Sequence, residues 1–339
     1  MTRKQNIVLM GLCLPFMFVS ASLFAGGAQE DQVVRIVAAH NQTSPGNPYQ
    51  VGMLKFKEVA EELSNGSIMV DVHAGTLGTS EPEMLEKMEM GALDVMVSSP
   101  GFMTQVGIEE IDLFALPYLF DSVEHWERVV SGEVGEKIAD IINEESGNKF
   151  KLLGFWSAGI RSYYGKQPLN SVNDIRGMTI RTQTSGVQGR FWRDIGAIPT
   201  SVAWGELYQA LQQGVVDAAE NAYPFFVAQS HHVATNGRYI TETEHDFTTP
   251  LLFISVSSYN ALSDEHKEII EQAAKASEEA ERNAVWEQME EFKQKAINDG
   301  AQVNRIDKAP FVQAAIPIQD EWASRMGMTD ILQEIRALR

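Results

Sequence analysis

The chain has 339 residues, a length that allows two domains of ordinary size and a well-buried core. Apolar residues make up 44% of it and charged residues 22%, as in ordinary globular proteins, which excludes bulk disorder. The formal net charge of -19 argues against binding to nucleic acid or to an anionic membrane surface, because both need a concentrated basic surface. An acidic protein that binds an anion needs a local, inward-pointing cation.

The N-terminus has the layout of an export signal. Two basic residues precede an apolar run over 7–24, and small residues then lead into a polar stretch. We expect cleavage after Ala25 or Ala28, which makes 1–28 a signal peptide. An uncleaved membrane anchor is the alternative, because the apolar run approaches spanning length. Cys13, the only cysteine, lies in this run, so the exported chain would have no disulfide and no thiol nucleophile.

The first hundred residues after the expected signal alternate between strands and helices. Short β-rich runs over 33–39, 68–73 and 92–97 enclose two segments, 49–63 and 81–89, whose apolar residues recur at helical spacing. This β-α-β-α-β order is the pattern of a parallel sheet that is covered by helices.

The middle of the chain continues in the same style. An apolar segment over 111–120 contains Pro117, so we interpret it as a packed loop, and a helical stretch from Asp121 to about Glu145 follows. Further strands are predicted over 150–156, 160–164, 178–182 and 215–220, with helices near 185–194 and 204–213.

A long helix dominates the C-terminal part. It follows a predicted strand over 251–258, starts at the capping residue Ser263 and runs to about Asn298. At the usual helical rise it would be roughly 50 Å long, which exceeds one small domain. The helix is therefore expected to lie along two domains, with a terminal helical hairpin as the alternative. A strand over 302–306 and further helices end the chain.

The motifs of common catalytic and cofactor sites do not occur in the sequence. It has no glycine-rich phosphate loop, no H-E-x-x-H and no G-x-S-x-G. The seven histidines are scattered apart from His231-His232, which we interpret as a helix-surface feature and not as a metal site. The sequence therefore predicts no catalytic residue, no cofactor and no metal.

Polar side chains instead occur at the ends of predicted strands. Asn41, Ser99 and Asn221 each end or follow a strand, and Arg161 and Arg181 lie on neighbouring predicted strands. In parallel α/β sheets, ligands lie beyond the carboxyl ends of strands, where an arginine presents a donor fork that matches a carboxylate. A structural salt bridge is the commoner role for one arginine alone. The coincidence of several such strand ends favours a site for a small organic acid.

Several short motifs are distributed along nearly all of the expected mature chain. They are Leu77-Gly78 with Glu83-Met84, MGALD at 90–94, FALPYLF at 114–120, GIR at 159–161, RGMTIR at 176–181, IPT at 198–200, GELYQALQ at 205–212 and GVVD at 214–217. Together they resemble the DctP-type solute-binding proteins of TRAP (tripartite ATP-independent periplasmic) transporters.

This resemblance implies an α/β, two-lobed periplasmic-binding-protein fold of type II-like organisation. Each lobe is a central sheet flanked by helices, and a hinge and one long helix join the two. The expected lobes are 31–158 plus 247–286, and 159–246 plus 287–339. The family also implies a monomeric periplasmic protein whose partners are a small DctQ-type and a large DctM-type membrane subunit. A helical-repeat accessory protein is a further expected type of partner.

The resemblance also implies roles for individual residues. Arg181 matches the arginine that holds the ligand carboxylate bidentately, and Arg161 matches a second arginine that assists it. Asn221 also matches a carboxylate contact. Trp204 stands at the usual aromatic wall of the pocket, although it could instead pack into the core. Two further assignments stay open: Tyr163 and Tyr164 could line the pocket or belong to the core, and His245 could line the cleft or lie on a loop surface.

The first lobe is expected to contact the rest of the ligand through Asn41, Glu81 and Ser99, and His40 resembles the sugar-acid-binding branch. The chain departs from the family where Gln183 replaces the proline of an Arg-Val-Pro motif. It also departs at 219–222, where the family's glutamine and proline are missing. These departures concern the rim of the pocket.

The expected function is the capture of a small carboxylate by domain closure and its delivery to membrane subunits driven by an ion gradient. Two alternatives stay open. One is an exported α/β enzyme that acts on a carboxylate, and the other is an exported sensor or accessory protein. The sequence does not distinguish sugar acids, dicarboxylates, keto acids and zwitterions, although the polar residues of the first lobe favour a hydroxylated acid.

Overall fold

The computed structural model describes residues 33–78, 80–103, 107–147, 149–183 and 185–339. The expected signal peptide lies outside the described residues. Within the described part, no helix combines the length and apolar character that crossing a bilayer requires.

Among the described residues, the first of two sheets has five strands in the order β2-β1-β3-β10-β4. The strands are β2 (Ile68–Ala74), β1 (Val34–His40), β3 (Val95–Ser98), β10 (Leu251–Ser255) and β4 (Phe150–Phe155). β1 pairs in parallel with β2 and β3, whereas β10 pairs antiparallel with β3 and β4. The β-α-β-α-β order predicted for this region is confirmed.

The second sheet has six strands among the described residues, in the order β11-β9-β5-β8-β6-β7. The strands are β11 (Gln302–Arg305), β9 (Tyr239–Phe247), β5 (Ile160–Gly165), β8 (Ala218–Asn221), β6 (Thr179–Thr182) and β7 (Ile198–Ser201). β6 runs parallel to β7 and β8, and β5 runs antiparallel to β8 and β9. The sequence analysis did not predict β7 or β9.

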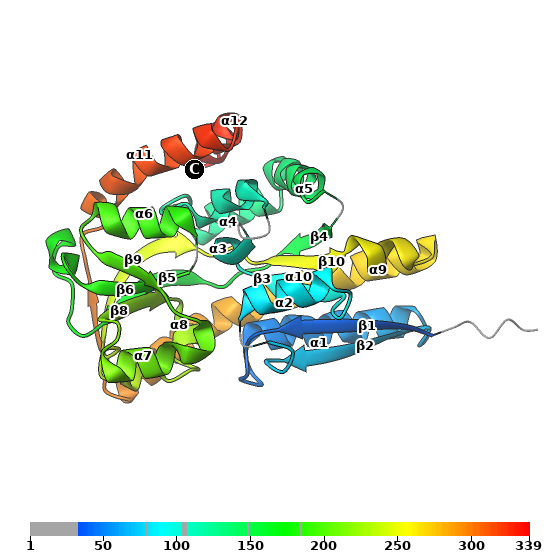
Figure 1. Ribbon diagram of the computed structural model, residues 1–339, viewed down its shortest axis with the longest axis horizontal. Coiled ribbons are helices and arrows are strands. Elements are labelled where there is room, and N and C mark those ends of the chain that lie inside the picture. Colours follow the sequence, from blue (N-terminus) through cyan, green and yellow to red (C-terminus); the bar gives the residue numbers. More distant parts are fainter. Residues whose placement is uncertain (1–32, 79, 104–106, 148, 184) are drawn as a thin grey trace, which may run out of the picture. The chain divides into compact units, whose positions relative to one another are not determined.

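Helices cover both sheets (Figure 1). Those that follow strands of the first sheet are α1 (Pro48–Leu63), α2 (Glu81–Glu89), α4 (Val123–Val130), α5 (Glu133–Glu145) and α9 (Val256–Ala261). Later helices are α6 (Gly186–Asp194), α7 (Leu207–Gln213), α11 (Ala309–Arg325) and α12 (Thr329–Ala337). Short helices and 3-10 turns are α3 (Pro100–Met103), η2 (Glu109–Ala115), η3 (Val172–Ile175), η4 (Trp204–Glu206), α8 (Tyr223–Phe226) and η5 (His231–Val233).

Two predicted elements differ in detail from the structure. The stretch predicted as one helix up to Glu145 is broken into α4 and α5 at Ser131 and Gly132, and its N-cap is Ser122, whose hydroxyl accepts from the backbone of His125. The strand predicted over 251–258 ends at Ser255, whose hydroxyl caps α9. In both cases a serine satisfies free N–H groups of a helix start that the apolar pattern does not reveal.

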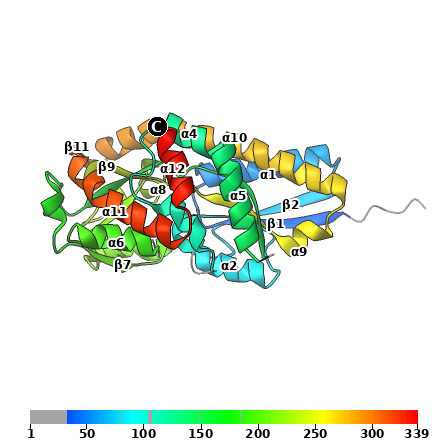
Figure 2. The same cartoon turned by 90° about the horizontal axis from the view of Figure 1, so that it is seen from above.

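The long helix α10 (Asp264–Asn298) has 35 residues and begins at Ser263, as predicted. Its cap is made by the Ser263 hydroxyl, which accepts from the backbone of His266 at 3.1 Å. Figure 2 shows α10 running along α1, and it also contacts β4 of the first sheet and α8 beside the second. The prediction that one helix serves both halves of the protein is confirmed.

The chain also passes between the sheets in two extended segments, which pair with each other. One joins β4 to β5 and the other joins β9 to β10. The backbone N–H of Trp156 donates to Pro250 at 2.8 Å, and that of Ala158 donates to Thr248 at 2.9 Å. Gly159 has a φ of 74°, and a Cβ there would lie 2.9 Å from the sulfur of Met289 on α10. This glycine lets the two segments and α10 approach closely.

The hydrophobic core has two clusters, and each draws on both sheets. One cluster includes side chains of α4, α5, α6, α11 and α12, and the other includes side chains of α1, α7 and α10. Tyr163 belongs to the first cluster and Tyr164 to the second, because successive residues of β5 point to opposite faces. Both tyrosines are therefore core residues.

Candidate functional site

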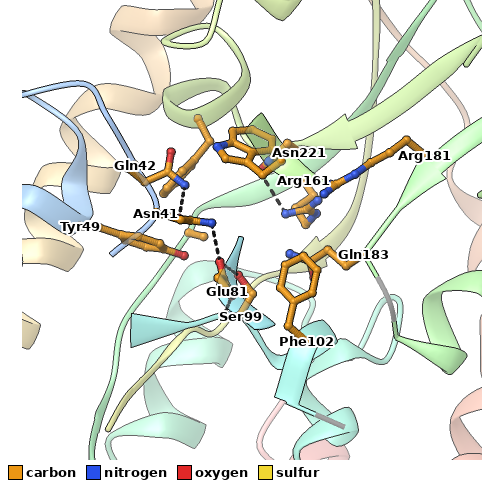
Figure 3. A pocket seen from close by; sticks show the side chains of 13 residues that line it. Asn41, Gln42, Tyr49, Glu81, Ser99, Phe102, Arg161, Arg181, Gln183 and Asn221 are labelled. Carbon is orange, nitrogen blue, oxygen red and sulfur yellow. Dashed lines mark hydrogen bonds between the residues drawn. The ribbon is translucent and has the colours of Figure 1, made fainter. Parts of the chain in front are cut away.

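A cavity lies where strands of both sheets end, and residues from both sides line it (Figure 3). Its lining consists of Asn41, Gln42, Tyr49, Glu81, Ser99, Phe102, Ala158, Arg161, Arg181, Gln183, Trp204, Asn221 and Phe225. The structure thus brings together seven of the eight residues selected from the sequence. The lining side chains leave this cavity an open volume of about 20 Å³, which is enough for about one water molecule. The walls must therefore separate before an organic acid can enter.

Arg161 is held by neighbours from its own sheet. Its Nε and Nη2 donate to the two carboxylate oxygens of Glu220, with the Nη2 bond at 2.7 Å, and Nη1 donates to Oδ1 of Asn221 at 3.1 Å. Both charged side chains are almost completely buried. A buried carboxylate paired with a bidentate arginine keeps both ions satisfied. Arg161 therefore presents Asn221 to the cavity while its own charge is neutralised.

Glu220 is the centre of this arrangement. Burial by itself would raise the pKa of its carboxyl, but the charge and hydrogen bonds of Arg161, with a further hydrogen bond from His245, lower that pKa to about 2. His245 Nε2 lies 3.2 Å from the Glu220 carboxylate, and its Nδ1 lies 2.9 Å from the Thr243 hydroxyl. His245 is thus buried on β9 and does not line the cavity.

Arg181 has different surroundings, although it lines the same cavity. Its Nε donates to the carbonyl oxygen of Val202 at 3.0 Å, and its guanidinium carbon lies 5.8 Å from the ring centre of Trp204. Of the described acidic residues, none forms a salt bridge with Arg181. Burial lowers the pKa of this guanidinium, which nevertheless remains a cation at neutral pH. The cavity therefore contains a buried cation without a partner carboxylate.

The opposite wall is organised around Glu81, the first residue of α2. Its carboxylate accepts hydrogen bonds from the backbone N–H of Ser99 at 2.6 Å, from the hydroxyls of Ser98 and Ser99, and from the amide of Asn41 at 3.2 Å. Burial raises the pKa of Glu81, and these hydrogen bonds oppose the rise. Glu81 fixes the orientation of Asn41 and Ser99 toward the cavity.

His40 is the one selected residue that does not line the cavity. Its Nε2 lies 2.6 Å from the amide oxygen of Gln50, and its Nδ1 accepts from the backbone N–H of Gln42 at 3.2 Å. Burial lowers the pKa of His40 to about 4, so the ring is neutral at neutral pH. Gln42 in turn donates to Asn41 at 2.8 Å, which makes His40 a support for that segment.

Two positional expectations need correction. Arg161 and Arg181 are not on neighbouring strands, because β8 lies between β5 and β6. Arg161 lies near the start of β5, which runs antiparallel to β8, so it still reaches the edge where β8 ends. His231 and His232 are not on a helix surface: both are buried in η5, bonded to the Tyr164 hydroxyl and to Asp299.

The sequence analysis missed several lining residues. Gln42 follows Asn41 directly, and Gln183 lies two residues after Arg181, the spacing that puts strand side chains on one face. Tyr49 and Phe225 pack edge to face at 5.1 Å between ring centres. Their apolar character predicts core as readily as a pocket wall. Nowhere in the described part of the chain do three or more acidic, histidine or cysteine side chains gather in a way that could hold a metal ion.

Comparison with known proteins gives consistent results. The model of bacterial extracellular solute-binding protein family 7, DctP, matches residues 38–325. A solute-binding protein of Chromohalobacter salexigens is 30% identical over 269 residues, which cover 78% of each chain.

Two solved structures of TRAP periplasmic solute-binding proteins are also similar. One, from Pseudomonas putida F1, holds D-glucuronate; it is 27% identical, with a TM-score of 0.84, over 90% of this chain and 97% of that one. The other, from Sulfitobacter sp. NAS-14.1, holds β-D-galacturonate; it is 28% identical, with a TM-score of 0.83, over 89% of this chain and 99% of that one. The chain therefore belongs to the DctP family, the solute-binding proteins of TRAP transporters.

Proposed function

We propose that the chain captures a compact hydroxylated monocarboxylate, a sugar acid of hexuronate size, in the cavity between its two sheets. Arg181 binds the carboxylate, Arg161 and Asn221 assist it, and Trp204 forms a wall. Asn41, Glu81 and Ser99 bind the hydroxyl groups, and His40 supports Asn41 from behind. The chain carries out no reaction on this ligand.

The observation that carries this proposal is the buried guanidinium of Arg181 without a carboxylate partner. Burying an unpaired charge is costly, whereas a ligand carboxylate would satisfy the guanidinium in a site of reduced polarity. Arg161 is the internal comparison, since a protein carboxylate already satisfies it. Of the two buried arginines that line the cavity, only Arg181 has no carboxylate partner among the described residues, which favours a ligand with one carboxylate.

The other wall supports a hydroxylated ligand. Glu81, Asn41 and Ser99 offer a carboxylate, an amide and a hydroxyl, which are groups that accept hydrogen bonds from ligand hydroxyls. A second ligand carboxylate would face the Glu81 carboxylate at short range, which is unfavourable. The glucuronate and galacturonate bound by two similar proteins agree with this chemistry.

Closure of the lobes delivers the ligand. We take the lobes to be 31–158 plus 247–286, and 159–246 plus 287–339, with a cleavable signal over 1–28 that directs the monomer to the periplasm. A ligand that touches both lobes stabilises the closed state by its differential affinity for that state. The closed form then binds a small DctQ-type and a large DctM-type membrane subunit. These subunits transport the ligand and are driven by an ion gradient.

A thermal-shift screen of the exported protein tests the ligand class. The panel contains D-glucuronate, D-galacturonate, dicarboxylates and keto acids, with D-glucose and D-galactose as matched sugars without the carboxylate. A uronate at about 100 times its dissociation constant should stabilise the folded state by about 2.7 kcal/mol. Calorimetry then measures its affinity. Equal binding of the uncharged sugars, or binding of dicarboxylates alone, would contradict the proposal.

A further inference from the structure

Two segments that belong to different sheets meet beside the cavity at Gly101 and Gln183. Gly101 lies on α3, directly after β3 of the first sheet, and Gln183 follows β6 of the second. A Cβ built on Gly101 would lie 2.5 Å from Oε1, 3.0 Å from Cβ and 3.3 Å from Cδ of Gln183. These three atoms are the nearest ones to that position, so Gln183 packs directly on this glycine.

The contact is buried and belongs to the wall of the cavity. Gln183 is 6% exposed and lines the cavity together with Phe102, the residue after Gly101. Figure 3 labels both side chains among those that line the cavity. No described residue hydrogen-bonds to the buried Oε1 of Gln183, which costs free energy in this arrangement.

The position of Gln183 relates this contact to the ligand. Gln183 follows the last residue of β6, two positions after Arg181, and both side chains line the cavity. A ligand held by Arg181 therefore lies beside the Gln183 amide. A molecule too bulky at this place pushes Gln183 outward, and Gln183 then cannot pack on Gly101.

We propose that Gln183 is a specificity-determining residue, because its packing on Gly101 completes the pocket wall only around compact sugar acids. This proposal rests on the proposed function and adds which residue of that site selects between ligands. Hexuronates, in which the carbon next to the carboxylate carries a hydrogen, leave the contact intact. Sialic acids, in which that carbon is fully substituted and the molecule is larger, separate the two residues.

A double-mutant cycle tests the contact. The variants are Gly101→Ala, Gln183→Ala and the double variant, with Gly189→Ala as the matched control because nothing lies within 4 Å of a Cβ at that helical glycine. Gly101→Ala should raise the dissociation constant for D-glucuronate about tenfold, through faster dissociation. When Gln183 is already alanine, adding Gly101→Ala should change the dissociation constant for D-glucuronate by less than about threefold. Gly189→Ala should bind like the wild type.

Specificity is the second readout. The wild type should prefer D-glucuronate to N-acetylneuraminate, and Gln183→Ala should reduce this preference about tenfold or more. Equal binding by Gly101→Ala and Gly189→Ala, or an unchanged preference in Gln183→Ala, would overturn the inference while the proposed function stands. A wild type that binds no sugar acid would overturn both. The melting temperatures without ligand show whether each variant is folded.

Discussion

The guanidinium groups of Arg161 and Arg181 both line the cavity, but only Arg161 has a carboxylate partner among the described residues. The partner, Glu220, is buried with it on the adjacent strand β8. The same type of side chain therefore has two roles, which are set by its neighbours. Arg161 organises the sheet edge, and Arg181 is available to an external anion.

Replacement of Arg181 by alanine should remove the main contact to the ligand. We expect the dissociation constant for D-glucuronate to rise at least about tenfold, which corresponds to about 1.4 kcal/mol, because the loss includes a charge-assisted bidentate hydrogen bond. Isothermal titration calorimetry measures it. Arg190→Ala on α6 is the control, since Arg190 is partly exposed, pairs with Asp194 and does not line the cavity. Unchanged binding by Arg181→Ala would exclude this anchor.

Glu81 should decide between sugar acids with one and with two carboxylates. Replacing it with glutamine removes the negative charge that faces the ligand and keeps the side-chain shape. The preference for D-glucuronate over D-glucarate, which has a second carboxylate, should then fall about tenfold. Competition titration against both acids measures the ratio. An unchanged ratio in Glu81→Gln would mean that charge at this position does not select the ligand.

Much of the candidate site could be predicted from single residues. Arg181, Asn41 and Ser99 stand at or just after strand ends, where ligands of parallel α/β sheets lie. The partner of Arg161 could not be predicted, because it depends on the order of strands in the sheet. The family pattern places Gln183 at the pocket rim, but its contact could not be predicted, since it depends on a glycine 82 positions earlier that packs against it.

At the scale of elements, strands that contain many polar residues could not be recognised from the sequence pattern, even where they are buried. Tyr239–Phe247 forms β9 between β5 and β11, but its sequence YITETEHDF contains four titratable side chains besides its tyrosine and therefore resembles a loop. Three of them, Glu242, His245 and Asp246, are buried, and the last two bond within the sheet and to α6. β7 was missed because it has four residues and contains Pro199, which is tolerated at this sheet edge.

The contact between η2 and α6 should make the stability of the protein depend on pH. The Ser185 hydroxyl, which caps α6, donates to Asp112 of η2 at 3.1 Å. Burial raises the pKa of Asp112 from 3.8 to about 6, although this hydrogen bond opposes the rise. The folded state therefore keeps a proton that the unfolded state releases. Stability is greatest below the unfolded pKa and falls as the pH rises toward 6.

Asp112→Asn cannot ionise and should lack this pH dependence. Between pH 4 and 7, the free energy of unfolding of the wild type should fall by up to about 3 kcal/mol relative to the variant. Urea unfolding at several pH values measures the free energy of unfolding of the wild type and of Asp112→Asn. Asp140→Asn on the exposed face of α5 is the control. Parallel stability curves for the wild type and Asp112→Asn would show that Asp112 does not titrate in this range.

At the scale of the whole molecule, two sheets share one long helix and two paired crossing segments. Segments that cross between two sheets in this way can act as a hinge. Because both core clusters draw on both sheets, rotation about the crossing also moves side chains within these clusters. The sequence could predict this organisation because each half repeats the βα pattern and because α10 is too long for one small domain. The packing of the halves depends on interlobe contacts that no local pattern reveals.

The chain has a net charge of -19, and Arg181 is the one buried arginine without a salt bridge in the described part of the chain. This combination has a kinetic consequence. The expected signal peptide over 1–28 contains two basic side chains and no acidic one, so its removal changes the net charge from -19 to -21. A negatively charged protein repels an anion at long range, whereas Arg181 attracts it only after entry. The long-range field should therefore slow the first encounter between the protein and its ligand.

The association rate for D-glucuronate should accordingly rise with ionic strength. Between about 10 mM and 150 mM salt the screening length shrinks from roughly 30 Å to roughly 8 Å, and we expect an increase of about twofold or more. Stopped-flow measurement of the intrinsic tryptophan fluorescence can follow the reaction, because Trp204, one of six tryptophans, lines the cavity. A rate that falls with added salt would instead mean that the cavity steers anions inward against the field of the whole molecule. In that case the protein would bind its ligand fastest at low ionic strength, whereas we expect the fastest binding at high ionic strength.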